Sequence, residues 1–164
     1  MSEIPNEDAT MQEPVRVLVV DDEPAICKAL MIALQRAGYD ARSAQSGDSA
    51  LALMGREHID VLLIDLRIPD TRGDVVFELV AATHPHLRQQ TVFMTGDISE
   101  RATRLIASCK CPMLKKPFEL REMLSEVAAV VPERRRQANA GLTWRSSSSP
   151  SGASSGYFGT TPSR

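Results

Sequence analysis

A chain of 164 residues can form one domain with a proper hydrophobic core and has some length to spare for tails. A net charge of −2 and a pI near 5.9 exclude a whole-chain electrostatic attraction to nucleic acid or to an anionic membrane. No apolar run approaches the roughly 20 residues that a membrane-spanning helix needs, and the amino terminus carries no signal pattern. We therefore expect a cytoplasmic protein with no membrane and no nucleic-acid partner.

Composition divides the chain into three regions. Residues 1–14 are polar and acidic without a basic residue, and we expect a disordered amino-terminal arm. Residues 15–131 carry the regular apolar patterns of a folded domain. Residues 132–164 are rich in Ser and Gly without periodicity, so we expect a disordered tail. The arginines at 134–136 are expected to interact with the dipole of the helix that precedes them.

The first half of the domain alternates strands and helices. Residues 17–20 form the first predicted strand, and Pro24 suits the first turn of a helix that Gly38 ends. The next strand, 39–44, is more polar and is expected at a sheet edge. Ser46 then caps a predicted helix that runs to about residue 58. Four aliphatic residues and an aspartate follow at 61–65, as in a strand buried on both faces of a parallel sheet.

The second half repeats this alternation. A helix from about residue 74, ended by His84-Pro85, precedes a strand at 91–95 and a helix that follows Gly96-Asp97. A short strand at 113–115 leads to the last helix, from about residue 119 to Pro132. Five such alternations predict an α/β fold, a doubly wound parallel sheet with helices on both faces.

Apolar residues at helical spacing predict which face of each helix is buried. The predicted inward residues are Ile26, Ala29, Leu30, Ala33 and Ala37 in the first helix, Val75, Val76, Leu79 and Val80 in the third, and Leu120, Met123, Leu124, Val127 and Val131 in the last.

Polar residues follow the strands at one edge of this sheet, because the carboxyl ends of parallel strands meet there. They are Asp21-Asp22, Asp65, Thr95 and Lys116. Two carboxylates 4 Å apart repel by about 4 kcal/mol at an effective dielectric of 20, and a bound Mg²⁺ would remove that cost. A carboxylate at this edge can accept a phosphoryl group as an acyl phosphate, so Asp65 is a candidate nucleophile. Lys116 and Thr95 could then contact the phosphoryl oxygens.

Four motifs in this order resemble the receiver domain of response regulators in two-component signalling, over roughly residues 15–131. They are V-L-V-V-D-D-E at 17–23, D-L-R-I-P-x-x-x-G at 65–73, M-T-G at 94–96 and K-P-F at 116–118. The resemblance implies a flavodoxin-like sheet of five strands in the order 2-1-3-4-5. The M-L-K-K-P-F ending at 113–118 is similar to receivers attached to hybrid sensor kinases.

The resemblance also assigns roles to residues. Asp65 would be the phosphoacceptor, and Asp21 and Asp22 would bind Mg²⁺ together with Asp65 and the main-chain carbonyl of Arg67. Thr95 would be the switch hydroxyl. Lys116 would be the lysine before the proline, a bond that is often cis in this family. Lys115 should point away from the pocket, because side chains alternate along a strand.

Two departures from the family pattern affect switching. Met113 stands where the family has a tyrosine or phenylalanine whose ring turns inward on phosphorylation, so the usual coupling of that ring to Thr95 is not expected. Arg67 and Asp97 occupy the two positions that tune loss of the phosphoryl group. Their opposite charges could pair over the pocket, and we therefore expect slow self-dephosphorylation.

The resemblance implies a histidine kinase or a phosphotransfer protein as partner, docking near Asp65 and the first helix. The output surface would be formed by the fourth helix, the fifth strand and the fifth helix, and the same face could support a weak homodimer. With 33 residues after Val131, we expect a stand-alone receiver without a DNA-binding output domain, and its downstream protein target is unknown. We expect no enzyme activity beyond self-phosphorylation from a donor and slow self-dephosphorylation.

Two other functions stay open. A hydrolase of the haloacid dehalogenase type also uses an Asp after a strand and Mg²⁺, but it needs a second acid two residues later, where this chain has Arg67. A receiver-like binding module that never accepts phosphate usually lacks an acidic residue or the lysine, and none is missing here.

Cysteine and histidine residues indicate no separate site. Three cysteines cannot all pair within one chain, which suits a reducing cytoplasm, and Cys109-x-Cys111 lacks partners at zinc-ligand spacing. The histidines show no catalytic spacing and are expected to be surface loop residues. The residues concerned are Cys27, Cys109, Cys111, His58, His84 and His86.

Overall fold

The computed structural model describes residues 13–69, 71–96, 99–133 and 135–136. Its elements are β1 (Arg16–Val20), α1 (Pro24–Arg36), β2 (Asp40–Ala44), α2 (Gly47–Met54), β3 (Val61–Asp65), α3 (Gly73–Thr83), the short 3₁₀ helix η1 (Pro85–Arg88), β4 (Thr91–Thr95), α4 (Glu100–Cys109), β5 (Met113–Lys115) and α5 (Leu120–Val130). All five predicted strands are present, and the first two differ from the prediction by one residue at one end.

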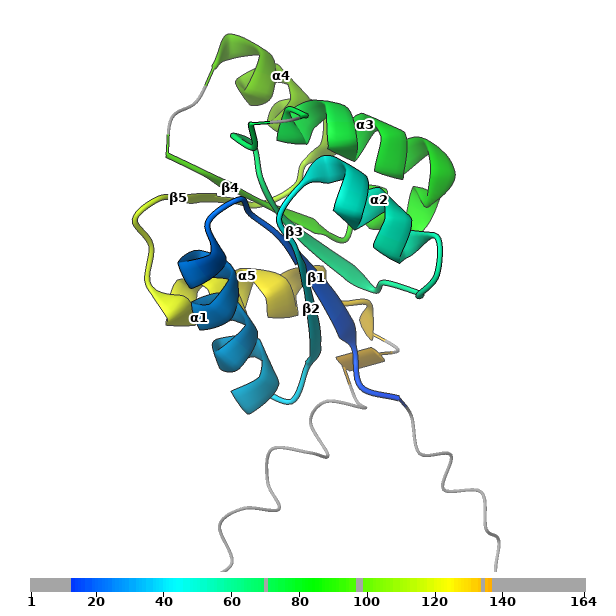
Figure 1. The fold of residues 1–164 in the computed structure, drawn as a ribbon, viewed down its shortest axis with the longest axis vertical. Helices are drawn as coiled ribbons and strands as arrows, with labels where there is room; N and C mark the ends of the chain where they lie inside the picture. The colour runs from blue at the N-terminus through cyan, green and yellow to red at the C-terminus, as the bar shows by residue number, and fades with distance from the viewer. Residues whose placement is uncertain (1–12, 70, 97–98, 134, 137–164) are drawn as a thin grey trace, which may run out of the picture.

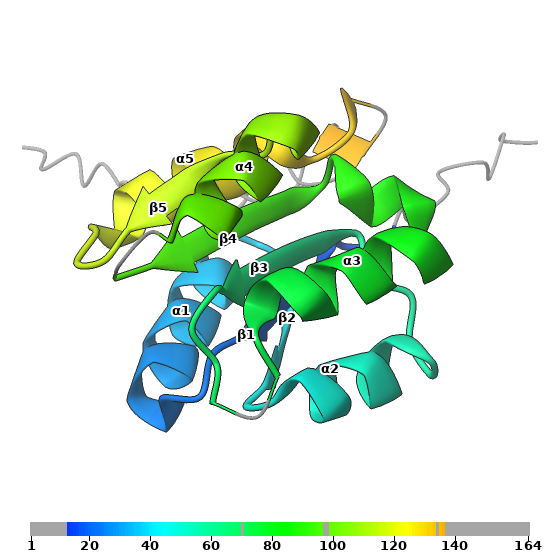
Figure 2. The ribbon, with the colours of Figure 1, turned by 90° about the horizontal axis from the view of Figure 1, so that it is seen from above.

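The five strands form one parallel sheet in the order β2-β1-β3-β4-β5, as the resemblance implied. The polar strand β2 lies at an edge, as predicted. In Figure 1 the helices α2, α3 and α4 lie on one side of the sheet, and α1 and α5 lie on the other. Figure 2 shows α1 and α2 on opposite sides of the edge formed by β1 and β2.

Strand alternation divides the core into two clusters, one under each helical layer. The cluster facing α2, α3 and α4 takes Leu18, Val20, Leu62, Ile64 and Phe93 from the sheet. The cluster facing α1 and α5 takes Val17, Val19, Val61, Leu63, Val92 and Met94. Successive residues of β1, β3 and β4 are buried on alternate faces of the sheet. The sequences of these strands are therefore unbroken apolar runs.

The buried face of α1 differs from the prediction. The structure buries Cys27, Leu30 and Leu34, while Ala29 is exposed and Ile26 is half-buried. Burying a leucine removes more apolar surface from water than burying an alanine, so a rotation that covers Leu34 is favoured over one that covers the alanines. The end of the helix agrees with the prediction, because Gly38 follows with a φ of 88°.

Two other helix faces also needed correction. In α3, Phe77 is buried and Leu79 is 47% exposed, because the Phe77 ring packs edge-on against Phe93 with ring centroids 5.0 Å apart. In α5, Met123 and Val127 are buried as predicted, but Leu120 is 46% exposed at the first turn.

The second helix is shorter than predicted. Its start is as expected, because the Ser46 side chain accepts the main-chain N–H of Ser49. It ends at Met54 instead of near residue 58, since Gly55 caps it and the chain then turns toward β3.

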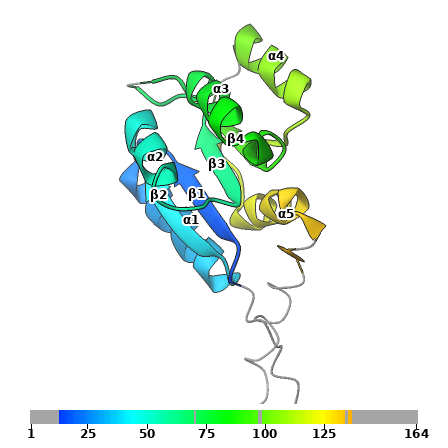
Figure 3. The same ribbon diagram turned by 90° about the vertical axis from the view of Figure 1, so that its right-hand side faces the viewer.

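The chain after α5 returns to the amino-terminal end of the sheet, next to the start of β1 (Figure 3). Arg135 pairs with Asp60, their side-chain atoms 2.9 Å apart. Arg136 donates hydrogen bonds to the carbonyls of Ala129 and Val131, so it contacts the carboxyl end of α5 as expected for a cation at a helix end. Arg134 lies outside the described residues, as do nearly all of the predicted arm and tail, and those two predictions stay predictions.

Two further expectations concern chemistry and membranes. Cys27, Cys109 and Cys111 are all free thiols. Within the described residues, every helix is too short or too polar to span a bilayer.

Candidate active site and metal centre

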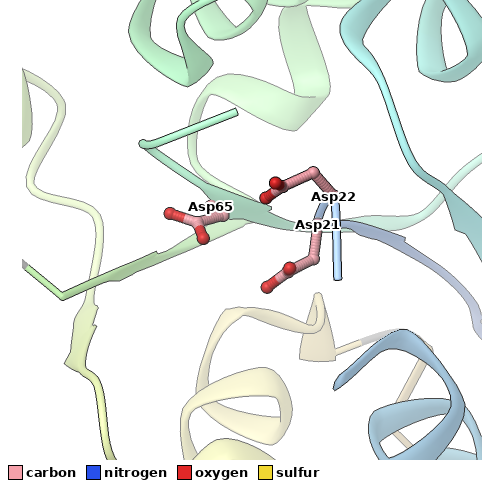
Figure 4. Close-up of side chains that lie close together, drawn as sticks. All are labelled: Asp21, Asp22 and Asp65. Atoms are coloured by element: carbon pink, nitrogen blue, oxygen red, sulfur yellow. The ribbon is translucent and has the colours of Figure 1, made fainter. Parts of the chain in front are cut away.

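Three aspartates meet where β1 and β3 end. Asp21 and Asp22 follow β1, and Asp65 is the last residue of the neighbouring strand β3. Figure 4 shows their carboxylates close together at the ends of the two strands, and each offers an oxygen within 4.8 Å of the other two. Asp21 and Asp65 are 0% and 4% exposed, while Asp22 is half-buried. The three carboxylates that were predicted as metal ligands therefore lie together.

Two of these carboxylates are held in the same way. The Oδ1 atom of Asp21 accepts the main-chain N–H of Glu23 at 2.9 Å, and Oδ1 of Asp65 accepts the N–H of Arg67 at 2.8 Å. In both cases a carboxylate at a strand end bonds to the backbone two residues later, a common turn for Asp. The two Oδ2 atoms remain available to another partner.

Lys116 bridges these two oxygens. Its Nζ lies 2.7 Å from Asp21 Oδ2 and 2.6 Å from Asp65 Oδ2. Burial lowers the pKa of the Lys116 ammonium, but its hydrogen bonds to Asp21 and Asp65 outweigh burial and raise the pKa above its usual value. Lys116 is therefore charged and shared between β1 and β3, although it follows the edge strand β5.

The main chain around Lys116 fixes the position from which its side chain extends to Asp21 and Asp65. The main-chain N–H of Lys116 donates to the Thr95 carbonyl at 2.7 Å, which ties it to the end of β4. The Lys116-Pro117 peptide is cis, as the resemblance suggested. Lys115 is exposed, in line with the prediction that it points away, and Thr95 is fully buried at the same strand end.

A glycine allows the loop after β3 to pass close to Asp65. A Cβ atom added to Gly73 would lie 2.1 Å from the Asp65 carbonyl oxygen and 2.8 Å from the Leu66 Cα. Both contacts are with backbone, so neither can be relieved by moving a side chain. The glycine that ends the D-L-R-I-P-x-x-x-G motif is thus required by close packing of the loop against Asp65 and Leu66.

The charges of this cluster do not balance. Three carboxylates face one ammonium group, which leaves two negative charges uncompensated within the cluster. A divalent cation would neutralise them, and oxygen atoms from closely spaced carboxylates are the ligands that Mg²⁺ prefers. The residues present therefore fit a magnesium ion, held by Asp21, Asp22 and Asp65, and the predicted fourth ligand, the Arg67 carbonyl, belongs to the loop that directly follows.

Three other residues bear on the predicted site. Asp97 lies outside the described residues, so its pairing with Arg67 stays a prediction. Met113 is half-buried and packs against the core cluster under α2, α3 and α4. Sequence reasoning missed Cys27, whose thiol donates a hydrogen bond to the Asp21 carbonyl at 3.2 Å. Burial, followed by the nearby Asp21 charge, raises the pKa of that thiol. Cys27 lies one turn into α1, beyond the motif, so no pattern indicated it.

The sequence matches the family described as the response regulator receiver domain over residues 17–128. Among curated proteins, it is 31% identical to the transcriptional regulatory protein TrcR of Mycobacterium tuberculosis over 120 residues, which are 72% of this chain and 46% of TrcR. It is 33% identical to the response regulator MprA of Mycolicibacterium vanbaalenii over 118 residues, 72% of this chain and 51% of MprA. The chain thus spans about half the length of these relatives.

Solved structures show the same fold. A CheY-like receiver domain protein from Methanospirillum hungatei superposes with a TM-score of 0.67 at 22% identity, covering 79% of this chain and 99% of that one. The chemotaxis protein CheY4 of Vibrio cholerae gives a TM-score of 0.66 at 25% identity, covering 73% of this chain and 100% of that one.

Proposed function

Because the chain belongs to the response regulator receiver family, we propose that Asp65 accepts a phosphoryl group from a phosphohistidine, carried by a histidine kinase or a phosphotransfer protein, and that the reaction requires Mg²⁺. The observation that carries the proposal is the bridge of Lys116 between Asp65 and Asp21, inside a cluster with surplus negative charge. Such a cluster has a nucleophile, a place for a metal ion and a cation for phosphoryl oxygens.

The transfer itself exchanges one bond for another. A carboxylate oxygen of Asp65 attacks the phosphorus of the donor, and a P–O bond forms as the P–N bond to the donor imidazole breaks. The electron pair of the broken bond stays on the imidazole nitrogen, which takes up a proton from solvent. The product is an acyl phosphate on Asp65, and the step depends mainly on positioning and charge stabilisation.

Lys116 and Thr95 would act on the transferred group. In the structure Lys116 Nζ lies 2.6 Å from Asp65 Oδ2, and we expect it to move to a phosphoryl oxygen once that carboxylate has become the mixed anhydride, an acyl phosphate. Thr95, buried at the end of the adjacent strand, would donate its hydroxyl to another oxygen. Mg²⁺, when bound by the three aspartates, would offset charge on the phosphoryl oxygens.

An apolar groove beside Lys116 supports docking of the donor protein at this end of α1. The groove has a volume of about 460 Å³ and lies between α1 and the start of α5, where Ile26, Phe118 and Leu120 line it. Leu120 is 46% exposed, although sequence periodicity placed it in the core. An apolar surface next to the phosphoacceptor is suited to the packing of a partner helix.

We further propose that phosphorylation changes a protein-binding surface on α4, β5 and α5, the face that could also support a weak homodimer. Shifting a two-state equilibrium from 1:99 to 99:1 takes roughly 5.5 kcal/mol of differential stabilisation. The interaction energy of a phosphoryl dianion with a metal ion and Lys116 is of that order. The relatives are named as transcriptional regulators and response regulators. For this chain we propose that the signal is passed on by binding to another protein, without DNA binding of its own.

The acyl phosphate would be long-lived, and the chain would not turn over a phosphate ester. A hydrolase of the haloacid dehalogenase type needs an acid two residues after its nucleophile, where Arg67 stands. We expect faster loss of the phosphoryl group in Arg67→Ala and in Asp97→Ala, followed as acyl-phosphate decay after the donor has been removed. Unchanged lifetimes in both variants would refute the proposed pairing.

The phosphorylation itself is tested by intact-protein mass spectrometry of the full chain with acetyl phosphate and Mg²⁺. The wild type should gain the mass of one phosphoryl group, and Asp65→Asn should gain none. Asp60→Asn is the matched control, because Asp60 is an equally buried aspartate at the other end of β3 and should leave the modification intact. Modification of Asp65→Asn, or modification of the wild type in excess EDTA, would contradict the proposal.

A further inference from the structure

Asp21 is held at each of its polar atoms. Its main-chain N–H donates to the Ala44 carbonyl at 3.1 Å, and its two carboxylate oxygens accept the Glu23 N–H and the Lys116 ammonium group. Its main-chain carbonyl accepts a hydrogen bond from the thiol of Cys27 at 3.2 Å. Both the main chain and the side chain of Asp21 are therefore fixed at the end of β1.

Asp22 is held in a different way. Its side chain is half-buried, and among the described residues none makes a hydrogen bond to it. The direction of its carboxylate then depends on the main chain, and above all on the peptide group that joins it to Asp21. The carbonyl oxygen of that peptide is the atom that Cys27 contacts. One thiol thus holds the peptide between two of the three carboxylates predicted as metal ligands.

The position of Cys27 is set by the packing of α1. Its side chain is 3% exposed and lies in the core cluster facing α1 and α5, together with Leu30 and Leu34. Its main-chain N–H donates to the Glu23 carbonyl at 3.1 Å, in the first turn of the helix. Because the helix and the surrounding core fix this side chain, the sulfur stays beside the Asp21 carbonyl.

We propose that Cys27 is a positioning residue of the magnesium site, and that its thiol fixes the Asp21–Asp22 peptide so that both carboxylates can reach one ion. A thiol is a weak donor, but a carbonyl oxygen only accepts, so the direction of the hydrogen bond is settled. Groups that hold metal ligands in place affect metal affinity without touching the metal. This inference rests on the proposed Mg²⁺-dependent function and concerns how its metal site is built.

A role in packing alone is the alternative, because a free cysteine in a core behaves as a small apolar side chain. Two variants of nearly the same size separate the two roles. Cys27→Ala removes both the sulfur and the donor, whereas Cys27→Ser removes the sulfur and keeps a hydroxyl donor on the same carbon. Both leave similar space in the core, so a difference between their Mg²⁺ affinities comes from the hydrogen bond.

Cys111 offers a matched control. It is also buried, at 6% exposure, and its thiol also donates to a main-chain carbonyl, that of Arg88 at 3.1 Å. It precedes β5 and so lies at the opposite end of the parallel sheet from the aspartates. Cys111→Ala therefore removes a buried thiol and its hydrogen bond at a distance from the metal site.

The test is a calorimetric Mg²⁺ titration of the full chain under reducing conditions. We expect Cys27→Ala to bind Mg²⁺ about two- to tenfold more weakly than the wild type, the range that one ordinary hydrogen bond implies. Cys27→Ser should recover part of this loss, and Cys111→Ala should bind as the wild type does. NMR of the metal-free proteins gives a second readout, since the Asp21 carbonyl carbon and the Asp22 amide nitrogen should shift more in Cys27→Ala than in Cys27→Ser.

Three results would overturn the inference while leaving phosphorylation of Asp65 standing. The first is a wild-type Mg²⁺ affinity in Cys27→Ala, and the second is an equal loss in Cys27→Ser and Cys27→Ala. The third is a similar loss in Cys111→Ala, because a general loosening of the core would then be the cause. If the wild type itself binds no Mg²⁺, the proposed function fails and this inference fails with it.

Discussion

The two ends of β3 each carry a buried aspartate, and the comparison sets a structural ion pair beside the proposed phosphoacceptor site. Asp60, directly before the strand, is 6% exposed, and Asp65, its last residue, is 4% exposed. Both accept one main-chain N–H at 2.8 Å and one cationic side chain. They differ in how many other carboxylates share that cation.

At the amino-terminal end the charges balance. Asp60 pairs with Arg135, and His58 lies on its other oxygen. Burial alone would raise the pKa of the Asp60 carboxyl, but the Arg135 guanidinium and the Arg16 N–H outweigh it and hold the pKa below its usual value. This arrangement fixes the segment after α5 to the domain and leaves little charge for chemistry.

At the carboxyl end the charges do not balance. Lys116 is shared by Asp21 and Asp65, and Asp22 adds a third carboxylate within 4.8 Å. The surplus negative charge is unfavourable until a cation arrives, so this end has stability to gain from a ligand. Unbalanced charge, and not burial, is what distinguishes the proposed site from the ion pair at the other end of the strand.

The largest effect on stability is expected from Lys116→Met. Without the ammonium group Asp21 and Asp65 are left unpaired, and breaking a buried ion pair costs about 3–5 kcal/mol of unfolding free energy. Urea unfolding with and without Mg²⁺ should also show that Mg²⁺ stabilises the variant more than the wild type, because no lysine competes for the carboxylates. The exposed neighbour variant Lys115→Met is the control and should behave as the wild type does. Equal stabilisation of Lys116→Met and wild type by Mg²⁺ would argue against the surplus-charge account.

A smaller loss, about 1.5–3 kcal/mol at neutral pH, is expected from Asp60→Asn, which removes a carboxylate that accepts hydrogen bonds from a guanidinium and a backbone N–H. Because the pKa of Asp60 is lower in the folded than in the unfolded chain, its contribution is present above the unfolded value of about 3.9 and is lost as the pH falls through the folded value. Urea unfolding of both proteins across this range should show the gap closing in acid. A gap that stays constant would mean that the ionised pair is not its source.

Gly73→Ala should lower the unfolding free energy by about 1–3 kcal/mol and slow phosphorylation, because a methyl group there would push the loop away from the Asp65 backbone. Gly55→Ala is the matched control. Gly55 has a helical φ of −71°. A Cβ atom added there would lie 3.6 Å from its nearest neighbours, two main-chain carbonyl oxygens, so the change should be neutral or slightly stabilising. Thermal unfolding and phosphorylation rates of the two variants test this, and equal effects would contradict it.

The smallest effect has the opposite sign. In the absence of Mg²⁺, Asp22→Asn should stabilise the protein by about 1 kcal/mol, the repulsion of two unit charges 4 Å apart in water, because one of three crowded carboxylates becomes neutral. The same variant should bind Mg²⁺ more weakly. Urea unfolding and calorimetric Mg²⁺ titration measure the two changes, and destabilisation of the metal-free protein would show that Asp22 has a structural role.

The sequence was sufficient to predict the five strands and the residues at their carboxyl ends. Apart from the polar strand β2, each strand contains a short apolar run bounded by Asp, Gly or Pro, and parallel topology then places Asp21, Asp65, Thr95 and Lys116 at one edge. The strand order itself came from the resemblance, because apolar periodicity does not say which strands are neighbours.

Features that depend on packing were not predictable in this way. Periodicity cannot decide which of several nearby apolar residues is buried. It predicted Ala29 and Leu79 as inward residues, whereas the structure buries Leu34 and Phe77. The histidines were expected to be surface loop residues, and periodicity could not show that the His86 ring lies against those of His58 and His84. Long side chains such as Arg135 also make contacts that no sequence spacing indicates.

The central claim, that the unbalanced end of β3 is the phosphoacceptor site, is tested most directly by trapping the product chemically. After treatment with acetyl phosphate and Mg²⁺, borohydride reduces an acyl phosphate on aspartate to homoserine, and peptide sequencing by mass spectrometry locates it. The account predicts homoserine at position 65 and unmodified aspartate at positions 21, 22 and 60. Homoserine at any of these other positions, or none at position 65, would contradict it.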